Sequence, residues 1–399
     1  MRENMTKAEE KVINIITKYR GIMFFLIISV LGAWIRFQGR TLISGDMSIY
    51  LLPWYDQMTE QGFFTLKNQV GEYNILYQEL MALMTYIPWK PMYMIKVLSI
   101  AFDYLLAFAT ADFACKIKRE KRDSAIFQTV YAIVLLLPPV VLNSAYWGQC
   151  DSIFSFFAVL SLINLYEEKY NRSFIYLGIA FAFKLQTIFI FPFYVCLYFY
   201  KKKFSISKFL LAIFVFWLTG LPVYLLGRNL LDAFGIYLWQ TDQHRAMYFH
   251  IPSVWMFVGG DCDRLESYAV AMTMMILGIG LYLVMSGKKN LDSREDFFGF
   301  ACWIHWTCTL YLPNMHERYN YLLDIMWVML VAVNKKYLPY AAASILMSTV
   351  SYGFYLYDNG DITPFFSGMM LALWCLFTYR ELMNGKTGNK MCEAEKMQE

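Results

Sequence analysis

Long apolar runs recur along most of this 399-residue chain and constrain its fold more than any other feature. A helix needs roughly 20 mostly apolar residues to cross a bilayer. Runs of this kind follow one another from Ile22 to the region of Tyr379, with polar or basic segments between them. Hydrophobic residues make up 58% of the sequence, which exceeds the share in a soluble globular chain. The sequence therefore predicts an all-α, polytopic membrane helix bundle.

The runs give about 12 candidate membrane spans. Two of them, 173–184 and 187–200, are short for a full crossing. They are candidates for a broken or re-entrant pair, which is tolerated where the backbone faces protein or a water-filled cavity. The expected spans are 21–38, 92–114, 124–142, 150–166, 173–184, 187–200, 208–226, 267–286, 297–312, 318–333, 338–356 and 364–380.

The basic residues set the predicted orientation. With the amino terminus inside, most of the 35 Lys and Arg residues fall in short cytoplasmic segments, as the positive-inside rule requires. CKIKREKR at 115–122 and KKKFSISK at 201–208 are the strongest of these segments. We therefore expect a multi-pass protein of the plasma membrane with both termini in the cytoplasm. Residues 1–383 form a single transmembrane module and residues 384–399 a cytoplasmic tail.

Two long loops, 41–90 and 227–266, fall on the outside in this orientation. Loops longer than about 12–15 residues are usually functional or disordered, and the aromatic content of both loops argues against disorder. We expect them to lie over the bundle as amphipathic interfacial helices and short connections, with Trp and Tyr side chains at the depth of the lipid headgroups.

Five polar clusters are predicted to share this outer face, although none of them was used to set the topology. They are Gly45-Asp46 with Asp56, Trp147-Gly148-Gln149-Cys150-Asp151, Lys184-Leu185-Gln186, His244-Arg245 with His250, and His316-Glu317-Arg318-Tyr319. Ionisable residues near membrane depth are costly and tend to mark a substrate path where they converge. A carboxylate suits the deprotonation of a hydroxyl, and fixed cations stabilise a departing phosphate. Since the outer face has no supply of cytosolic nucleotide sugars, the pattern favours glycosyl transfer from a lipid-linked sugar phosphate.

The bulk charge and the spacing of the histidines give no support to a nucleic-acid partner or to a metal site. A net charge of +4 argues for neither a nucleic-acid partner nor an acidic one. The histidines lack the H-x-x-x-H and H-E-x-x-H spacings of metal sites. We therefore predict no cofactor and no obligatory metal.

Three motifs, WGQCD at 147–151, KLQ at 184–186 and MHERY at 315–319, resemble in order and rough spacing the bacterial relatives of the second mannosyltransferase of the GPI-anchor pathway. Asp46 followed by LLPWYD at 51–56 resembles the first outside loop of the wider GT-C glycosyltransferase class. The resemblance implies a GT-C membrane fold, a polyprenyl-phosphate-linked hexose donor such as mannose, and an inverting transfer. It also implies a catalytic aspartate in the first outside loop, which by position is Asp46.

Each candidate side chain also has a structural alternative. Asp46, the expected catalytic base, is placed to cap a helix that starts at Met47. Lys184, expected on the donor phosphate, has the alternative of snorkelling to the interface. Glu317 and Arg318 have the alternative of an ordinary ion pair, although Arg is well suited to fork a phosphate.

The candidates other than Asp46 are assigned either to the donor phosphate or to substrate binding in general. Asp151 has the alternative of an acid at a helix start, which the helix dipole favours, and Gln186 that of a helix–helix hydrogen bond. Trp147 has the alternative of an interface aromatic, and Gln149 that of a polar cap on the next span. Asp56 and the residues of the second loop, His244, Arg245 and His250, have the alternative of solvated charges. The predicted phosphate-binding residues are Lys184, Arg318, His316 and Arg245. The predicted substrate-binding residues are Trp147, Gln149, Asp151, Gln186, Asp56, Glu317, Tyr319, His244 and His250.

Two rival classes stay open beside a hexosyltransferase that acts on a glycan or glycolipid acceptor. A lipid-linked-sugar flippase or transporter would have a similar number of spans, but transporters commonly show a repeated half and charges near the midplane. No repeat is visible here, and the charges lie at one end. A non-catalytic subunit of an envelope polysaccharide complex would tolerate replacement of the clustered charges.

Overall fold

The computed structural model describes residues 5–243 and 245–383, and these residues form a mainly helical protein with almost no strands. The α-helices are α1 (Lys7–Gln38), α2 (Leu52–Gln61), α3 (Ile75–Met84), α4 (Pro91–Lys118), α5 (Ala125–Leu136), α6 (Pro138–Val141), α7 (Asp151–Tyr166), α8 (Tyr170–Phe183), α9 (Phe191–Lys201), α10 (Ser207–Leu218), α11 (Leu221–Leu225), α12 (Asp232–Asp242), α13 (Cys262–Met285), α14 (Arg294–Tyr311), α15 (Tyr321–Val333), α16 (Leu338–Tyr357) and α17 (Pro364–Thr378). The predicted all-α class is confirmed.

Short 3-10 and π-helical segments and one pair of strands complete the described chain. The helical segments are η1 (Met47–Leu51), η2 (Gly62–Lys67), η3 (Leu142–Trp147), η4 (Leu185–Ile190), η5 (Val254–Phe257), η6 (Lys335–Tyr337) and η7 (Tyr379–Met383). The strands β1 (Tyr248–Phe249) and β2 (Met315–His316) pair in parallel. The predicted tail at 384–399 and the candidate His244 lie outside the described residues.

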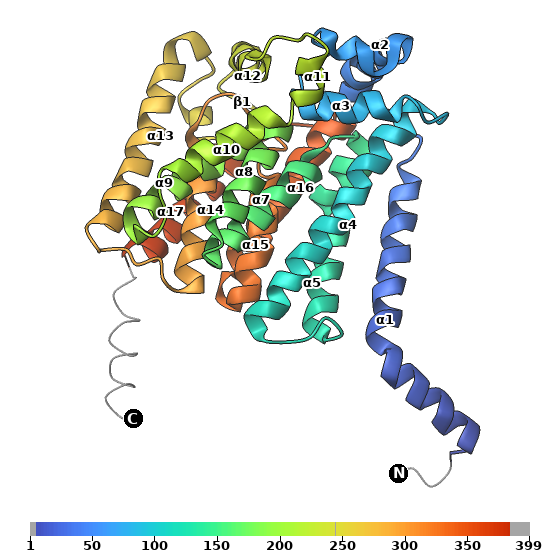
Figure 1. The fold of residues 1–399 in the computed structure, drawn as a ribbon. Coiled ribbons are helices and arrows are strands. Elements are labelled where there is room, and N and C mark those ends of the chain that lie inside the picture. Colours follow the sequence, from blue (N-terminus) through green and yellow to red (C-terminus); the bar gives the residue numbers. More distant parts are fainter. Residues whose placement is uncertain (1–4, 244, 384–399) are drawn as a thin grey trace.

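Most helices run side by side in a bundle, with α1 at one edge and α13 at the opposite edge (Figure 1). The segments of the two predicted outside loops, among them α2, α3, α12 and β1, gather at one end of the bundle. The α4–α5 connection, which carries part of the basic 115–122 segment, lies at the other end. The two predicted loops and the strongest basic segment are therefore on opposite ends of the molecule.

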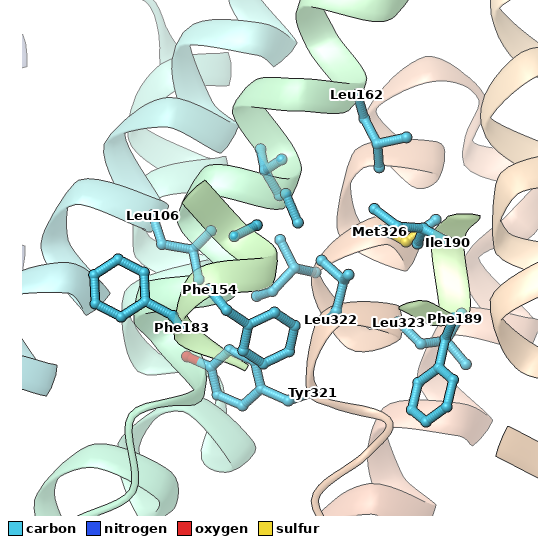
Figure 2. Packing of buried hydrophobic residues seen from close by; sticks show 14 of the residues in the cluster. Leu106, Phe154, Leu162, Phe183, Phe189, Ile190, Tyr321, Leu322, Leu323 and Met326 are labelled. Atoms are coloured by element: carbon cyan, nitrogen blue, oxygen red, sulfur yellow. The ribbon is translucent and has the colours of Figure 1, made fainter. Parts of the chain in front are cut away.

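The helices α14 and α15 form the centre of the bundle. Every residue of α15 from Tyr321 to Leu330 is buried, and so is every residue of α14 from Phe297 to Tyr311. Apart from a few buried polar residues such as His305 and Asp324, both stretches are apolar, and a helix of this kind is stable where it is enclosed on all sides. Figure 2 shows α15 side chains packed among those of neighbouring elements. The labelled residues are Leu106, Phe154, Leu162, Phe183, Phe189, Ile190, Tyr321, Leu322, Leu323 and Met326.

Three of the described helices, α1, α4 and α13, are long and apolar enough to cross a membrane, and α5 with the helix after it makes a fourth if the bent pair is one span. Five shorter apolar helical segments occur elsewhere: Ile75–Met84, Asp151–Tyr166, Leu185–Lys201, Ser207–Leu218 and Tyr321–Val333. These findings support a membrane protein. The larger number of spans and the interfacial position of the loop helices stay predictions.

Proline interrupts two segments that the sequence predicts as continuous spans. In 124–142 the chain bends by 52° between α5 and the following helix, because Pro138 and Pro139 stand at the start of α6 and proline cannot continue an upstream hydrogen-bond ladder. In 208–226, α10 ends at Leu218 and the separate α11 has Pro222 in its first turn.

The predicted break between 173–184 and 187–200 is present at Lys184. This residue has an extended backbone (φ −152°, ψ 136°) between α8 and η4. The extended residue ends one helix before the next begins, so its side chain is not part of either helix surface.

Candidate functional site

The first predicted outside loop positions Asp46 at the start of a short helical turn. The Asp46 side chain makes no helix-capping hydrogen bond, so the capping alternative is wrong. Ser44 takes that role instead, because its Oγ accepts from the Met47 N–H at 3.2 Å and donates to the Trp147 carbonyl at 2.7 Å. The carboxylate of Asp46 is therefore left to interact with other segments.

Two buried cations fix the end of α1 from which this loop starts. The Arg36 guanidinium donates to Asp103 Oδ2 on α4 at 2.8 Å. The Lys96 ammonium, also on α4, donates to the carbonyls of Gly39 and Leu42 at 2.7 and 2.6 Å. These contacts anchor the chain on both sides of the turn that leads to the carboxylate.

Four donor groups surround the carboxylate of Asp46. Its Oδ2 accepts from Trp147 Nε1 at 3.0 Å and from Gln149 Nε2 at 2.7 Å, and its Oδ1 accepts from the Tyr355 hydroxyl at 2.5 Å. Arg318 Nη1 lies 3.6 Å from Oδ2. Burial opposes ionisation, but the Arg318 charge and the hydrogen bonds from Tyr355 and Trp147 outweigh it and hold the pKa of Asp46 below its usual value. Asp46 is therefore ionised at neutral pH.

Lys184 and Asp151 form a second, more deeply buried pair. Lys184 Nζ lies 2.5 Å from Asp151 Oδ1, and the side chains are only 3% and 1% exposed. The snorkelling alternative for Lys184 is therefore wrong. Asp151 Oδ2 accepts from Asn143 at 2.6 Å, and Gln149 Oε1 accepts from Tyr73 at 2.6 Å and from Lys184 at 3.4 Å. Gln149 donates to Asp46 through Nε2. Its carboxamide therefore connects the Lys184–Asp151 pair with Asp46.

The MHERY segment lies against the second outside loop through the β1–β2 pairing. The rings of His316 and Phe249 stack with centroids 4.2 Å apart. Arg318 Nη1 donates to Glu317 Oε1 at 3.0 Å, and the guanidinium lies 5.2 Å from the centre of the Trp147 ring. Burial opposes ionisation of Glu317, but His316 and Arg318 hold its pKa below the usual value. The ion-pair alternative for Glu317 and Arg318 is therefore present, although Arg318 also faces Asp46.

A cavity of about 530 Å³ opens among these groups. Nine of the predicted site residues line it: Asp46, Gln149, Lys184, Gln186, His250, His316, Glu317, Arg318 and Tyr319. Its other lining residues include Tyr50, Trp54, Glu72, Tyr73, Gln240, Gln243, Phe249, Glu266, Asn314 and Tyr355. Trp147 and Asp151 are buried behind this wall and act on the cavity through the side chains that they contact.

Two predicted residues lie elsewhere. Asp56 is exposed on α2 and does not line the cavity. Arg245 is exposed and forms ion pairs with Asp263 at 3.1 Å and with Glu266. The structure thus brings neither side chain into the cavity wall, and their predicted substrate contacts stay predictions.

Tyr73 and Tyr355 contact the site, although no motif singles them out. Tyr73 donates to Gln149, and Tyr355 donates to Asp46. The one available signal for Tyr355 is its spacing of three residues from Tyr352, which puts both rings on the same face of a helix. That signal does not say which helix face is turned to the site.

Among the described residues, no group of three or more His, Cys, Asp and Glu side chains could hold a metal ion. Metal independence of the reaction stays a prediction, since it concerns the chemistry and not the fold.

The chain was compared with models of known protein families and with curated proteins. The family model for glycosyltransferase family 87 matches residues 73–311, which is more than half of the sequence. The matched part contains Gln149 and Lys184, whereas Asp46 and Arg318 lie outside it. A comparison with curated proteins finds no match. The GT-C class expected from the motifs is confirmed, and the narrower resemblance to the GPI-anchor enzyme stays a prediction. The chain belongs to glycosyltransferase family 87, a family of membrane glycosyltransferases of the GT-C type.

Proposed function

We propose that this membrane glycosyltransferase moves a hexose, with mannose as the first choice, from a polyprenyl-phosphate donor to a glycan or glycolipid acceptor with inversion. The observation that carries the proposal is an ionised carboxylate, Asp46, placed beside one guanidinium, Arg318, in a cavity at one end of a helical membrane bundle. A base and a fixed cation side by side suit a reaction that deprotonates a hydroxyl while an anion departs.

In the proposed step Asp46 takes the proton of the acceptor hydroxyl. The acceptor oxygen then bonds to the anomeric carbon of the hexose, and the bond between that carbon and the phosphate oxygen breaks. The phosphate leaves with the electron pair as polyprenyl phosphate. One direct displacement inverts the anomeric centre and needs a single base, which is what one ionised aspartate supplies.

Arg318 and His316 are the proposed contacts of the departing phosphate. Arg318 is engaged with Glu317 through Nη1, and its side chain lines the cavity and stays 15% exposed. Part of the guanidinium fork is therefore available to a phosphate oxygen. Lys184 lines the same cavity, but its ammonium is held by Asp151. We therefore assign Lys184 to fixing Gln149 and the donor phosphate to Arg318 and His316.

The single partly available guanidinium favours a donor with one negative charge. A sugar linked to a polyprenyl monophosphate carries one charge on its phosphodiester, whereas a diphosphate carries two. Glu72, Glu266 and Glu317 also line the cavity. Arg245 and Arg318 pair with Glu266 and Glu317, so the wall offers no excess of positive charge to a more strongly anionic donor. The charge balance thus supports the monophosphate donor.

The rest of the cavity wall suits a sugar. Gln240, Gln243 and Asn314 present amides, and Tyr50 and Trp54 present aromatic rings whose centroids are 5.8 Å apart. Amides hydrogen-bond hydroxyl groups in either direction, and aromatic faces cover the apolar side of a pyranose ring. This wall is the proposed place of the hexose and of the acceptor hydroxyl.

The extracytoplasmic position of the site is part of the proposal. The cavity is built from the end of the bundle that carries α2, α3, α12 and β1, and the basic α4–α5 connection lies at the other end. Basic connections stay on the cytoplasmic side, so this separation supports an outward-facing site in a multi-pass protein with cytoplasmic termini.

The test is transfer of labelled hexose from synthetic polyprenyl-phosphate hexose by the purified protein in lipid nanodiscs, with a panel of glycan and glycolipid acceptors. We expect transfer by the wild type and its loss in Asp46→Asn, which keeps the shape of the side chain but removes the base. Glu60→Gln, on the exposed surface of α2, is the matched control and should retain transfer. Normal transfer by Asp46→Asn would remove the base from the proposal. Movement of the intact lipid-linked sugar without transfer would favour the flippase.

A further inference from the structure

Tyr355 enters the site from a part of the chain that neither the motifs nor the family match include. It lies in the last turn of α16 and lines the cavity. Its ring is stacked on that of Trp147, with centroids 4.4 Å apart and an angle of 22°, and meets the edge of His250 at 5.8 Å. These contacts leave the ring little freedom to turn.

The two oxygens of Asp46 accept different numbers of hydrogen bonds. Oδ2 accepts from both Trp147 and Gln149 and lies 3.6 Å from Arg318. Oδ1 accepts from Tyr355 alone among the described residues. A carboxylate oxygen has two lone pairs, so Oδ2 is fully used and Oδ1 keeps one lone pair for a further donor.

We propose that Tyr355 is a positioning residue that holds Oδ1 of Asp46 toward the cavity as the oxygen that receives the acceptor proton. This inference rests on the proposed role of Asp46 as the base. The acceptor O–H donates to the remaining lone pair of Oδ1, and its proton passes to that oxygen as the new glycosidic bond forms. Tyr355 keeps its own proton throughout.

A purely structural role for Tyr355 would need only its ring. The stacking on Trp147 involves the ring face, and a phenylalanine would preserve it. The hydroxyl adds a hydrogen bond to a charged oxygen, and such a bond favours the ionised form of the carboxylate. The hydroxyl and the ring therefore make separable contributions, and removing the hydroxyl alone tests the proposal.

Other ionisable groups near the carboxylate of Asp46 also influence its pKa. Arg318 and His316 act on Asp46 from the segment before α15, Glu317 pairs with Arg318, and His250 lies against the Tyr355 ring. A substitution that leaves all four in place isolates the effect of the Tyr355 hydroxyl.

The variant Tyr355→Phe should therefore change the pH profile as well as the rate. We expect the acidic limb of kcat/KM to move up by about one pH unit, because a hydrogen bond to the ionised form is lost. We expect kcat on the plateau to fall about tenfold, because Oδ1 is no longer held in place. The KM for the donor should stay unchanged, because no proposed phosphate contact is altered.

Two further variants show whether a shift of the acidic limb is specific to the Tyr355 hydroxyl. Tyr340→Phe removes a hydroxyl from the same helix far from the cavity and should reproduce the wild-type profile. Replacement of Tyr355 by 3-fluorotyrosine keeps the shape of the residue but makes its hydroxyl a stronger donor. The acidic limb should then move in the opposite direction, to lower pH, and this readout holds even if the phenylalanine variant folds poorly.

An acidic limb that stays at the wild-type pH in both Tyr355 variants would overturn the inference. That result would leave the proposed function intact as long as the wild type transfers hexose and Asp46→Asn does not. Failure of the proposed function would instead be seen in those two proteins, before any Tyr355 variant is compared.

Discussion

The buried pair of Lys184 and Asp151 leads to a quantitative prediction about stability. The ammonium and the carboxylate are 2.5 Å apart and almost completely enclosed. The second oxygen of Asp151 accepts from Asn143 at 2.6 Å, and Lys184 also reaches Gln149 and lies 5.5 Å from the centre of the Tyr73 ring. Each charge is therefore compensated only as long as the other is present.

The magnitude follows from this geometry. At 2.5 Å and an effective dielectric constant of about 20, the attraction between the charges is about 7 kcal/mol. Desolvation of each ion offsets several kcal/mol of it, and removal of one partner of such a pair costs about 3–5 kcal/mol because the other charge is left buried alone. For a chain of 399 residues, the entropy of unfolding converts this loss to a drop in Tm of about 4–6 °C.

The assay is a double-mutant cycle of Lys184→Met, Asp151→Asn and the double variant in lipid nanodiscs. Apparent Tm at one scan rate is followed by the fluorescence of the 11 tryptophans. Each single variant should show the full drop in Tm of about 4–6 °C. The double variant should recover most of that drop, because no unpaired charge remains. Two single variants as stable as the wild type, or a double variant whose loss is the sum of both, would refute the reasoning.

Three further changes test the wall around Asp46 and one buried acid in the outside loops. Arg318→Lys keeps the charge but loses the planar fork, so kcat/KM measured by hexose transfer should fall about 10–100-fold. Gly148→Ala should lower kcat about tenfold with little change in donor KM, because Gly148 has a φ of +84° and a Cβ there would overlap the buried methyl group of Met47. Burial raises the pKa of Glu79 to about 7, so the neutral acid is favoured in the folded state. Its stability contribution is present at acidic pH and is lost as pH rises through about 7. Glu79→Gln should therefore flatten the plot of Tm against pH between 4.5 and about 7. An unchanged slope would contradict the raised pKa of Glu79.

The sequence predicts the fold class well because apolar composition and helical length are local properties. It predicts the break near Lys184 because the two neighbouring apolar runs are short. It misses the bend before Pro138 and the break before Pro222, although proline is a local signal, because each run is apolar on both sides of the break. Hydropathy alone therefore joins segments that backbone chemistry separates.

The candidate site is predictable by residue type but not by partner. WGQCD and KLQ are separate motifs in the sequence, and no spacing shows that Asp151 would take the ammonium of Lys184. The contact depends on the extended backbone of Lys184 and on the packing of α7 against α8. Tyr355 is less predictable still, because its position depends on the rotation of α16 about its axis. Tertiary packing decides both contacts.

With the roles proposed above, in which Asp46 is the base and Arg318 binds the donor phosphate, the network around Asp46 couples the base to the donor. Arg318 lies between Asp46 and Glu317, at 3.6 and 3.0 Å, and its charge is a main reason that the pKa of Asp46 is held low. An anionic phosphate bound to Arg318 offsets that charge, so the pKa of Asp46 should rise when the donor binds. The base then becomes stronger only once the sugar to be transferred is in place. The acidic limb of kcat, which reports the complex, should accordingly lie above that of kcat/KM measured for the free enzyme. Coincident limbs would show that the donor phosphate does not bind at Arg318.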